Sequence, residues 1–167
     1  MLVATLPAHY SPIGRRLPRD GVEADMAEID QYNLQRFIDA QDPIFDRVTA
    51  ELRMGKKESH WMWFIFPQLK GLGSSPMATK FAISSREEAT KYLNHPVLGP
   101  RLRDCSRMVT LSDRSAEEIF GSTDCLKFQS SMTLFRLVSD GENIFQNAID
   151  KYFSGELDRN TWRKLCE

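Results

Sequence analysis

The chain has 167 residues, of which 41% are apolar and 27% are charged, so it is long enough for one domain with a core of its own and short for two. Its 22 Lys and Arg almost balance its 23 Asp and Glu, and the net charge of −1 excludes an overall positive field that would attract nucleic acid or an anionic membrane. No apolar run approaches the roughly 20 residues that cross a bilayer, so we expect neither a nucleic-acid nor a membrane partner.

The first segment, residues 1–28, is predicted to be a flexible extension. It contains Pro7, Pro12 and Pro18 with only scattered apolar side chains, and it lacks the order of charged and apolar regions that a secretory signal has. Residues 29–167 are then expected to form a single domain.

Helical spacing of apolar residues begins directly after this extension. Residues 29–42 predict a first helix. Asp42 and Pro43 then predict the start of a second, as its capping residue and its first helical residue, and Gly55 predicts its end.

Further along the chain, two Ser-x-x-Glu patterns predict capping boxes. Ser85 with Glu88 would begin one helix, and Ser115 with Glu118 a shorter one. The remaining segments, 98–109, 124–138, 144–153 and 158–165, also repeat apolar residues at helical intervals. The predicted fold is mainly α, a single multihelical domain of about seven helices.

The segment from Trp61 to Phe66, WMWFIF, is the one whose type the sequence leaves open. Its continuous apolar character is typical of a buried strand and also of a helix buried on all sides. In a helix Trp61 and Trp63 would lie about 200° apart, so that one packs in the core and the other borders a cavity.

Polar residues flank this apolar segment and make it a candidate binding site. Trp61 and Trp63 could stack on a planar group such as a nucleobase, and Gln68 could hydrogen-bond an amide edge. A loop with little side-chain bulk follows and would bind phosphate through its N–H and hydroxyl groups; its candidate ligand residues are Gly71, Gly73, Ser74 and Ser75.

The candidate catalytic residues precede the tryptophans. Glu58 would act as a carboxylate and His60 as a group that titrates near neutral pH, with Lys57 adding a positive charge that binds the ligand. The competing interpretation is that the whole stretch is core, because a run of bulky apolar residues is usually buried and GLGSS lacks the spacing of known phosphate-binding loops.

Three cysteines and three histidines give no sign of a metal site. Cys105, Cys125 and Cys166 have no C-x-x-C spacing and cannot all pair, which fits a reducing cytoplasm, and the histidines form no H-x-x-x-H pattern. We predict no metal and no cofactor.

The chain resembles the family called domain of unknown function 1810 over Asn33 to Leu165. The segments that carry the resemblance are NLQRFIDAQD, GKKESHWMWFIFPQLKGLGSS, EEATKYLNHPVLGPRL, EIFGSTDCLKFQSSMTLF and FSGELDRNTWRKL. The resemblance implies a mainly α-helical and bacterial protein of uncharacterised function. Some members carry the label calpastatin, but such inhibitors are long, disordered and repetitive, whereas this chain has one aromatic-rich domain and no repeat.

A looser similarity in organisation links the chain to helical N-glycosidase domains that act on ADP-ribose-type substrates, with Glu58 as the nearest candidate glutamate. The first functional hypothesis is therefore a binder of a nucleotide-like or phosphate-bearing small molecule, extending to an N-glycosidase-type hydrolase. The alternative is a peptide- or protein-interaction module with an aromatic groove and no catalysis. The sequence decides neither whether the protein is an enzyme nor its oligomeric state.

Overall fold

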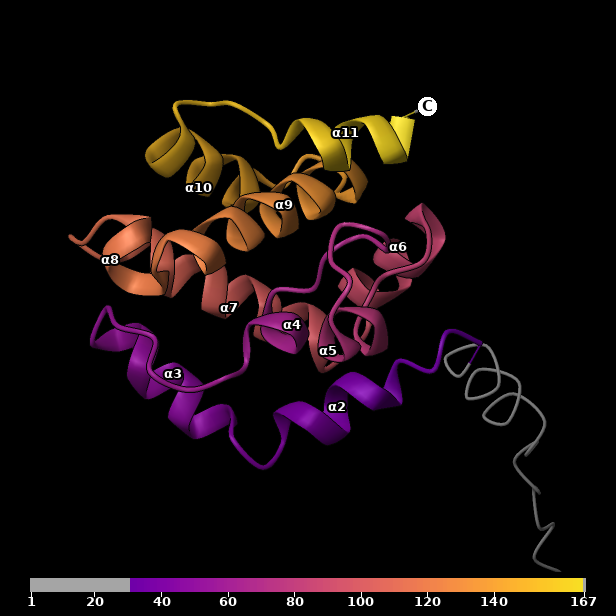
Figure 1. The fold of residues 1–167 in the computed structure, drawn as a ribbon, viewed down its shortest axis with the longest axis horizontal. Helices are drawn as coiled ribbons and strands as arrows, with labels where there is room; N and C mark the ends of the chain where they lie inside the picture. The colour runs from indigo at the N-terminus through magenta and orange to yellow at the C-terminus, as the bar shows by residue number, and fades with distance from the viewer. Residues whose placement is uncertain (1–30, 167) are drawn as a thin grey trace, which may run out of the picture.

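The computed structural model describes residues 31–166, and these residues form ten helices (Figure 1). In chain order they are α2 (Gln35–Gln41), α3 (Phe45–Arg53), α4 (Met62–Ile65), α5 (Pro76–Lys80), α6 (Arg86–Asn94), α7 (Leu98–Leu111), α8 (Ala116–Phe120), α9 (Ser122–Val138), α10 (Asn143–Phe153) and α11 (Arg159–Cys166). The predicted extension, residues 1–28, lies outside the described residues.

The mainly α fold predicted from the sequence is confirmed. Seven of the ten helices have seven or more residues, since only α4, α5 and α8 are shorter. Within residues 31–166 the single strand-like feature is an isolated parallel bridge between Leu69 and Ile83.

The longest helix, α9, lies in the middle of the structure and packs against α4, α6, α8, α10 and α11. Figure 1 shows α10 and α11 above it, α7 beneath it, and α2 and α3 along the lower edge. The side chains of Phe128, Met132, Leu134 and Phe135 on α9 are fully buried. Because helices cover α9 on several sides, buried residues occur around most of its circumference, as expected for a central helix.

The helix boundaries follow some of the sequence signals and not others. The predicted box at Ser115 and Glu118 is present in both directions. At Ser85 only half of a box forms, because the Glu88 carboxylate binds elsewhere. The predicted start at Asp42 is wrong: α3 begins at Phe45, and the Asp42 carboxylate instead pairs with an arginine of α7 at 2.8 Å.

The undecided apolar segment contains a single helical turn, α4, with Trp61 as its N-cap and Phe66 as its C-cap. Trp61 is fully buried and Trp63 is partly exposed, in agreement with the angular separation that a helix gives them. Phe66 is also sealed, with its ring centroid 4.9 Å from that of Phe128 and 5.9 Å from that of Phe120. Most of the segment is therefore core.

Replacing Phe135 with alanine is expected to lower the free energy of unfolding by about 3–5 kcal/mol, the usual cost of removing a buried phenyl ring. Phe135 is fully buried on α9, and its ring lies 5.4 Å from Tyr92 and 5.9 Å from Phe145. The control Leu126→Ala, on an α9 residue that is 64% exposed, should cost under about 0.5 kcal/mol in the same urea titration. Equal losses in the two variants would contradict this assignment of the buried face.

Candidate functional site

Two of the polar residues before the tryptophans, Glu58 and Ser59, donate hydrogen bonds to the carboxylate of Glu51. Glu51, a buried residue of α3, accepts hydrogen bonds at Oε2 from the backbone N of Glu58 at 2.8 Å and of Ser59 at 3.1 Å. The Trp61 Nε1 donates to the same oxygen at 2.8 Å, and the Ser59 hydroxyl donates to Oε1. These groups therefore have a structural partner in Glu51.

This arrangement holds Glu51 in its ionised form. Burial by itself would raise the pKa of the carboxyl group, but the hydrogen bonds from the Ser59 hydroxyl, the backbone of Glu58 and Ser59 and the Trp61 indole outweigh it and lower the pKa to about 2. The loop before α4 thus resembles a small anion-binding site whose anion is a side chain of α3.

The two predicted catalytic residues lie on the surface. Glu58 is exposed, and its carboxylate lies 3.6 Å from the ammonium of Lys56. His60 is exposed as well. Neither residue lines the two hollows bordered by α11 that are described below.

The predicted ligand residues Lys57 and Trp63 meet charged residues of α9: Lys57 pairs with Asp124, and Trp63 contacts Lys127. The Lys57 ammonium lies 2.8 Å from the Asp124 carboxylate and 5.3 Å from the Trp61 ring, while Lys127 lies 2.7 Å from the same carboxylate and 4.9 Å from the Trp63 ring. Burial opposes ionisation of Asp124, but the two lysines together lower its pKa. The faces of both indoles thus already carry a cation.

The predicted phosphate loop is divided between a helix start and a hollow. The Ser75 hydroxyl accepts a hydrogen bond from the Ala78 N at 3.1 Å and caps α5. Ser74 and Gly73 are exposed, and a Cβ on Gly73 would lie 2.8 Å from the side chain of Ala78. Gly71 has a φ of +86°, which favours glycine, and it lines a hollow.

Gln68 contributes through its backbone. Its carbonyl accepts a hydrogen bond from the Ile83 N at 2.9 Å, and the Lys70 N donates to the Ile83 carbonyl at 2.8 Å. This short parallel pairing fixes the segment before Gly71 beside the segment that leads into α6. Two stretches with distant positions in the sequence therefore line adjoining surface hollows.

Both of these hollows are bordered by α11. The Gly71 hollow, of about 530 Å³, is lined by Gly71, Leu72, Asn160, Arg163 and Lys164. The Ser84 hollow, of about 430 Å³, is lined by Leu69, Lys70, Ser84, Ser85, Arg86, Lys164 and Leu165. Because Lys164 lines both, we treat the two hollows together as one basic basin.

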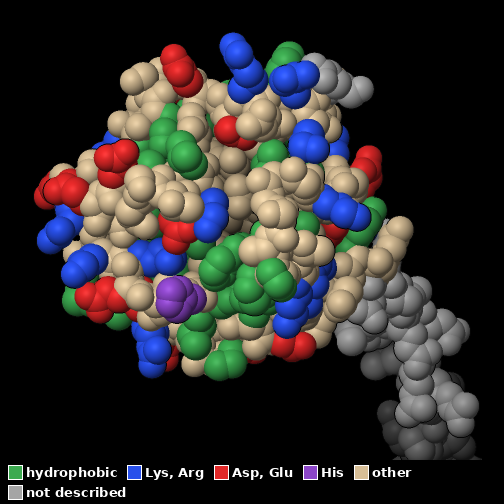
Figure 2. Space-filling model, in the orientation of Figure 1, with side chains coloured by type: hydrophobic (Ala, Val, Ile, Leu, Met, Phe, Trp, Pro, Cys, Tyr) green, Lys and Arg blue, Asp and Glu red, His purple; other side chains and the backbone are tan. Residues whose placement is uncertain are grey.

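The basin is positively charged. Four cationic side chains line it, namely Lys70, Arg86, Arg163 and Lys164, and among residues 31–166 neither lining contains Asp or Glu. Figure 2 shows Lys and Arg side chains gathered over α11 and towards α6 on this face. A surface concavity with one sign of charge attracts ligands of the opposite sign.

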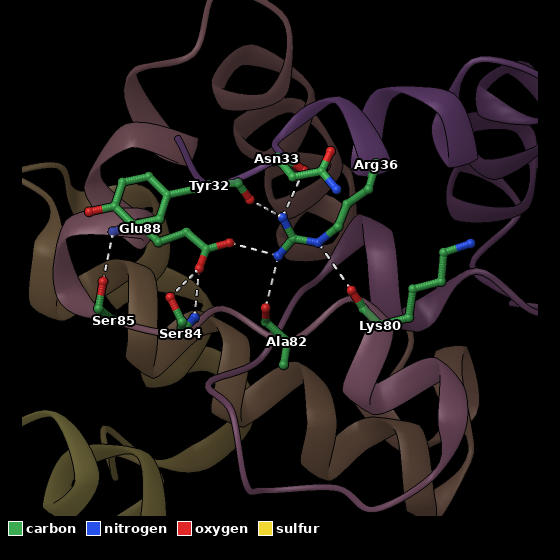
Figure 3. A network of polar contacts seen from close by, with 8 residues as sticks. All are labelled: Tyr32, Asn33, Arg36, Lys80, Ala82, Ser84, Ser85 and Glu88. Carbon is green, nitrogen blue, oxygen red and sulfur yellow. Dashed lines mark hydrogen bonds and ion pairs between the residues drawn. The ribbon is translucent and has the colours of Figure 1, made fainter. Parts of the chain in front are cut away.

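An ion pair beneath the Ser84 hollow holds its wall in place (Figure 3). Arg36 of α2 donates from Nη2 to the Glu88 Oε1 at 2.7 Å and to the Ala82 carbonyl at 2.9 Å, and its Nε donates to the Lys80 carbonyl at 3.0 Å. The other Glu88 oxygen accepts bonds from the Ser84 N at 2.8 Å and its hydroxyl at 2.6 Å. The entry to α6 is therefore fixed by bonds from both sides.

Sequence reasoning missed most of the basin. Lys70, Arg86, Asn160, Arg163 and Lys164 are polar residues on or beside helices, and in the sequence such residues are indistinguishable from an ordinary solvated face. Arg86 shows the difficulty: its Nη1 donates to the Leu137 carbonyl at 2.8 Å, a contact across 51 residues. Gly71 is the basin residue that the sequence did single out, as part of the predicted phosphate-binding loop.

Residues 31–166 contain no group of three or more His, Cys, Asp or Glu side chains that could hold a metal ion. None of their helices is both long and apolar enough to cross a membrane.

Comparisons with known proteins were consistent with one another. The sequence pattern of the family described as "Protein of unknown function (DUF1810)" matches residues 31–165. The crystal structure of the conserved hypothetical protein Rv1873 from Mycobacterium tuberculosis is similar, with 50% sequence identity and a TM-score of 0.81, over 83% of this chain and 99% of that chain. No curated protein matches the chain.

Stability should depend on pH through Glu51. Because its folded pKa of about 2 lies below the ordinary value of 4.5, the stabilisation is complete above pH 4.5 and is lost as the pH falls towards 2. The shift corresponds to about 3 kcal/mol of unfolding free energy. We expect urea titrations of Glu51→Gln to show a large loss at about pH 6 and a much smaller loss at about pH 3 relative to the wild type.

The matched control is Glu58→Gln, which removes an exposed carboxylate from the same loop. It should leave both the stability and its pH dependence almost unchanged. If Glu51→Gln keeps the full acid dependence of the wild type, the hydrogen bonds to Glu51 do not hold its charge.

Proposed function

The chain belongs to the DUF1810 family of proteins of unknown function, and from its own surface we propose that it binds a phosphate-bearing small molecule in the basic basin. The observation that carries this proposal is the charge of the basin. Among the residues that the structure describes, the linings of two adjoining hollows that share Lys164 contain four Lys or Arg side chains and no carboxylate. Bonds between a cationic side chain and a phosphate oxygen are stronger than neutral hydrogen bonds, so such a basin favours a phosphate group.

Neutral groups in the basin add hydrogen-bonding capacity. The Asn160 amide and the Ser85 hydroxyl lie in its two linings, and Ser85 also begins α6. These features support binding of a phosphorylated compound with further polar groups.

The support is weaker for a nucleotide-like ligand and for N-glycosidase chemistry. Within the described part of the chain, neither lining contains an aromatic side chain on which a base could stack. Cleavage of a glycosidic bond needs a carboxylate near the anomeric carbon, and Glu58 lies in neither lining. The geometry therefore favours binding over catalysis.

The alternative of a peptide-binding aromatic groove receives little support from the segment that suggested it. Trp61 and Phe66 are sealed in the core, and the exposed part of Trp63 is covered on one face by Lys127. We place the proposed function in a bacterial cytoplasm, where phosphorylated metabolites occur; the absence of any disulfide among Cys105, Cys125 and Cys166 accords with this location.

The proposal can be tested by isothermal titration calorimetry with ribose phosphate and adenosine monophosphate. Lys164→Met retains most of the length of the side chain and removes its charge, so it should weaken binding of ribose phosphate by about tenfold or more, since a charged hydrogen bond contributes about 1.5–3 kcal/mol. The unfolding temperature should hardly change, because Lys164 is exposed.

Lys56→Met is the charge-matched control, since Lys56 is exposed and lies in neither lining of the basin. It should bind ribose phosphate like the wild type. Equal weakening in both variants would mean that the attraction is general and not that of a site. Tighter binding of adenosine monophosphate than of ribose phosphate would show that a base is recognised after all.

A further inference from the structure

We propose that the chain has a further ligand site, which binds an organic cation with an apolar body. The site is a hollow of about 560 Å³ between α8, the first turns of α9 and the end of α10, and we call it the Cys125 hollow. Its volume is typical of small-molecule sites. In Figure 1 α8 lies at the left edge and α6 on the right, so this hollow is remote from the basic basin and does not depend on the proposed function.

The inner surface of the hollow suits an apolar group. The Cys125 side chain is only 7% exposed, and its sulfur forms no hydrogen bond within residues 31–166. Burial, together with the charge of Glu117, raises the pKa of this thiol, so it stays neutral. Tyr152 and Phe153 are half-buried with ring centroids 6.5 Å apart, and Leu126 is 64% exposed. A neutral thiol, two aromatic rings and a leucine together offer contacts to an apolar ligand.

The ammonium of Lys151 lines the hollow but is directed to the backbone. Its Nζ donates to the carbonyl of Thr110 at 2.7 Å and to that of Ser112 at 2.6 Å. These carbonyls belong to the end of α7, where the last C=O groups of a helix have no partner within the helix itself. Lys151 therefore completes the end of α7.

The second cation in the lining, Arg114, lies beside other groups as well. A Cβ on Gly55 would be 2.8 Å from the Arg114 Cδ, so this side chain passes along the turn that ends α3. Hydrogen bonds from Ser115 lower the pKa of the Glu118 carboxylate, and the charge of Arg114 lowers it further. Arg114 thus acts on a carboxylate outside the lining of the hollow.

Two carboxylates in the lining, Asp113 and Glu117, have no such partner. Neither side chain forms an ion pair or a hydrogen bond with another residue of the described part of the chain. The capping box of α8 uses Glu118 and leaves Glu117 unused. Both charges act on the hollow, because Asp113 adds to the effect of burial in raising the pKa of Tyr152, as Glu117 does for Cys125.

An ammonium group in the hollow would give these carboxylates the partner that they lack. Hydrogen bonds between an ammonium and a carboxylate are about twice as strong as neutral ones, and a cation is also attracted to the face of an aromatic ring. A compound with an aromatic ring joined to an ammonium by a short linker would meet both requirements of the lining. The ligand class is therefore an aromatic amine.

The test is a ¹⁵N NMR titration of the full chain with phenylethylamine, which is a cation at neutral pH. The comparison ligands are the neutral phenylethanol, the anionic phenylpropionate and ethylamine, which has no ring. The Leu126 amide reports on the Cys125 hollow and the Gly71 amide on the basic basin. Phenylethylamine should shift the Leu126 signal alone, with a Kd at least about tenfold below those of phenylethanol and ethylamine, since each of these lacks one of the two contacts.

Glu117→Gln keeps the shape of the side chain and removes its charge. It should weaken phenylethylamine by at least about fivefold and leave phenylethanol unchanged. Glu87→Gln is the matched control, because Glu87 is exposed, lies outside the lining and is the second residue of α6, as Glu117 is of α8. Asp113→Asn tests the other carboxylate. All three residues are exposed, so the variants should fold.

Several results would overturn the inference. If phenylethanol binds as tightly as phenylethylamine, or phenylpropionate more tightly, the carboxylates do not select the ligand. If Glu87→Gln weakens phenylethylamine as much as Glu117→Gln and Asp113→Asn do, the attraction is that of the whole surface. If no compound with a ring shifts the Leu126 amide, the hollow is not a site for apolar ligands. The proposed function would stand in each case, since it is tested with ribose phosphate at the basin.

Discussion

The ion pair between Arg36 and Glu88 is the contact on which the arrangement of the helices around the basin depends. Both side chains are largely removed from water, with exposed fractions of 15% and 3%. Removing one partner of such a pair typically costs about 3–5 kcal/mol, because the other is left as an uncompensated buried charge. Arg36 also donates to the carbonyl groups of Lys80 and Ala82, so the pair joins α2, the end of α5 and the start of α6 in one network.

The need of a buried carboxylate for hydrogen-bonding partners also fixes the loop before α4. Glu51 is a second buried carboxylate, and it is satisfied by backbone N–H groups, a hydroxyl and the Trp61 indole in place of a cation. The aromatic segment therefore lies between two loops, each held by a buried glutamate. The apolar side chains of Trp61 and Phe66 fill the core between them, while the charges of the basin remain at the surface.

The sequence predicted elements that depend on neighbouring residues. The capping box at Ser115 and the helix that Asp158 begins both form, since Thr161 N donates to the Asp158 carboxylate at 2.8 Å. The prediction failed where a polar side chain had a distant partner. Asp42 pairs with an arginine of α7, and Glu88 with one of α2, so neither was available to its own helix start in the expected way.

The sequence by itself determined that the described residues form a mainly helical fold, because periodicity and capping act over three or four residues. The sequence left open whether the aromatic run is core or binding site, and the structure buries most of it. Only the tertiary structure decided where charge gathers. Lys70, Arg86 and Lys164 come together because the pairing of Leu69 with Ile83 and the packing of α11 on α9 bring three remote segments to one surface. No local sequence pattern predicts that these three residues lie together, since a solvated lysine has the same sequence neighbours whether or not it lines a hollow.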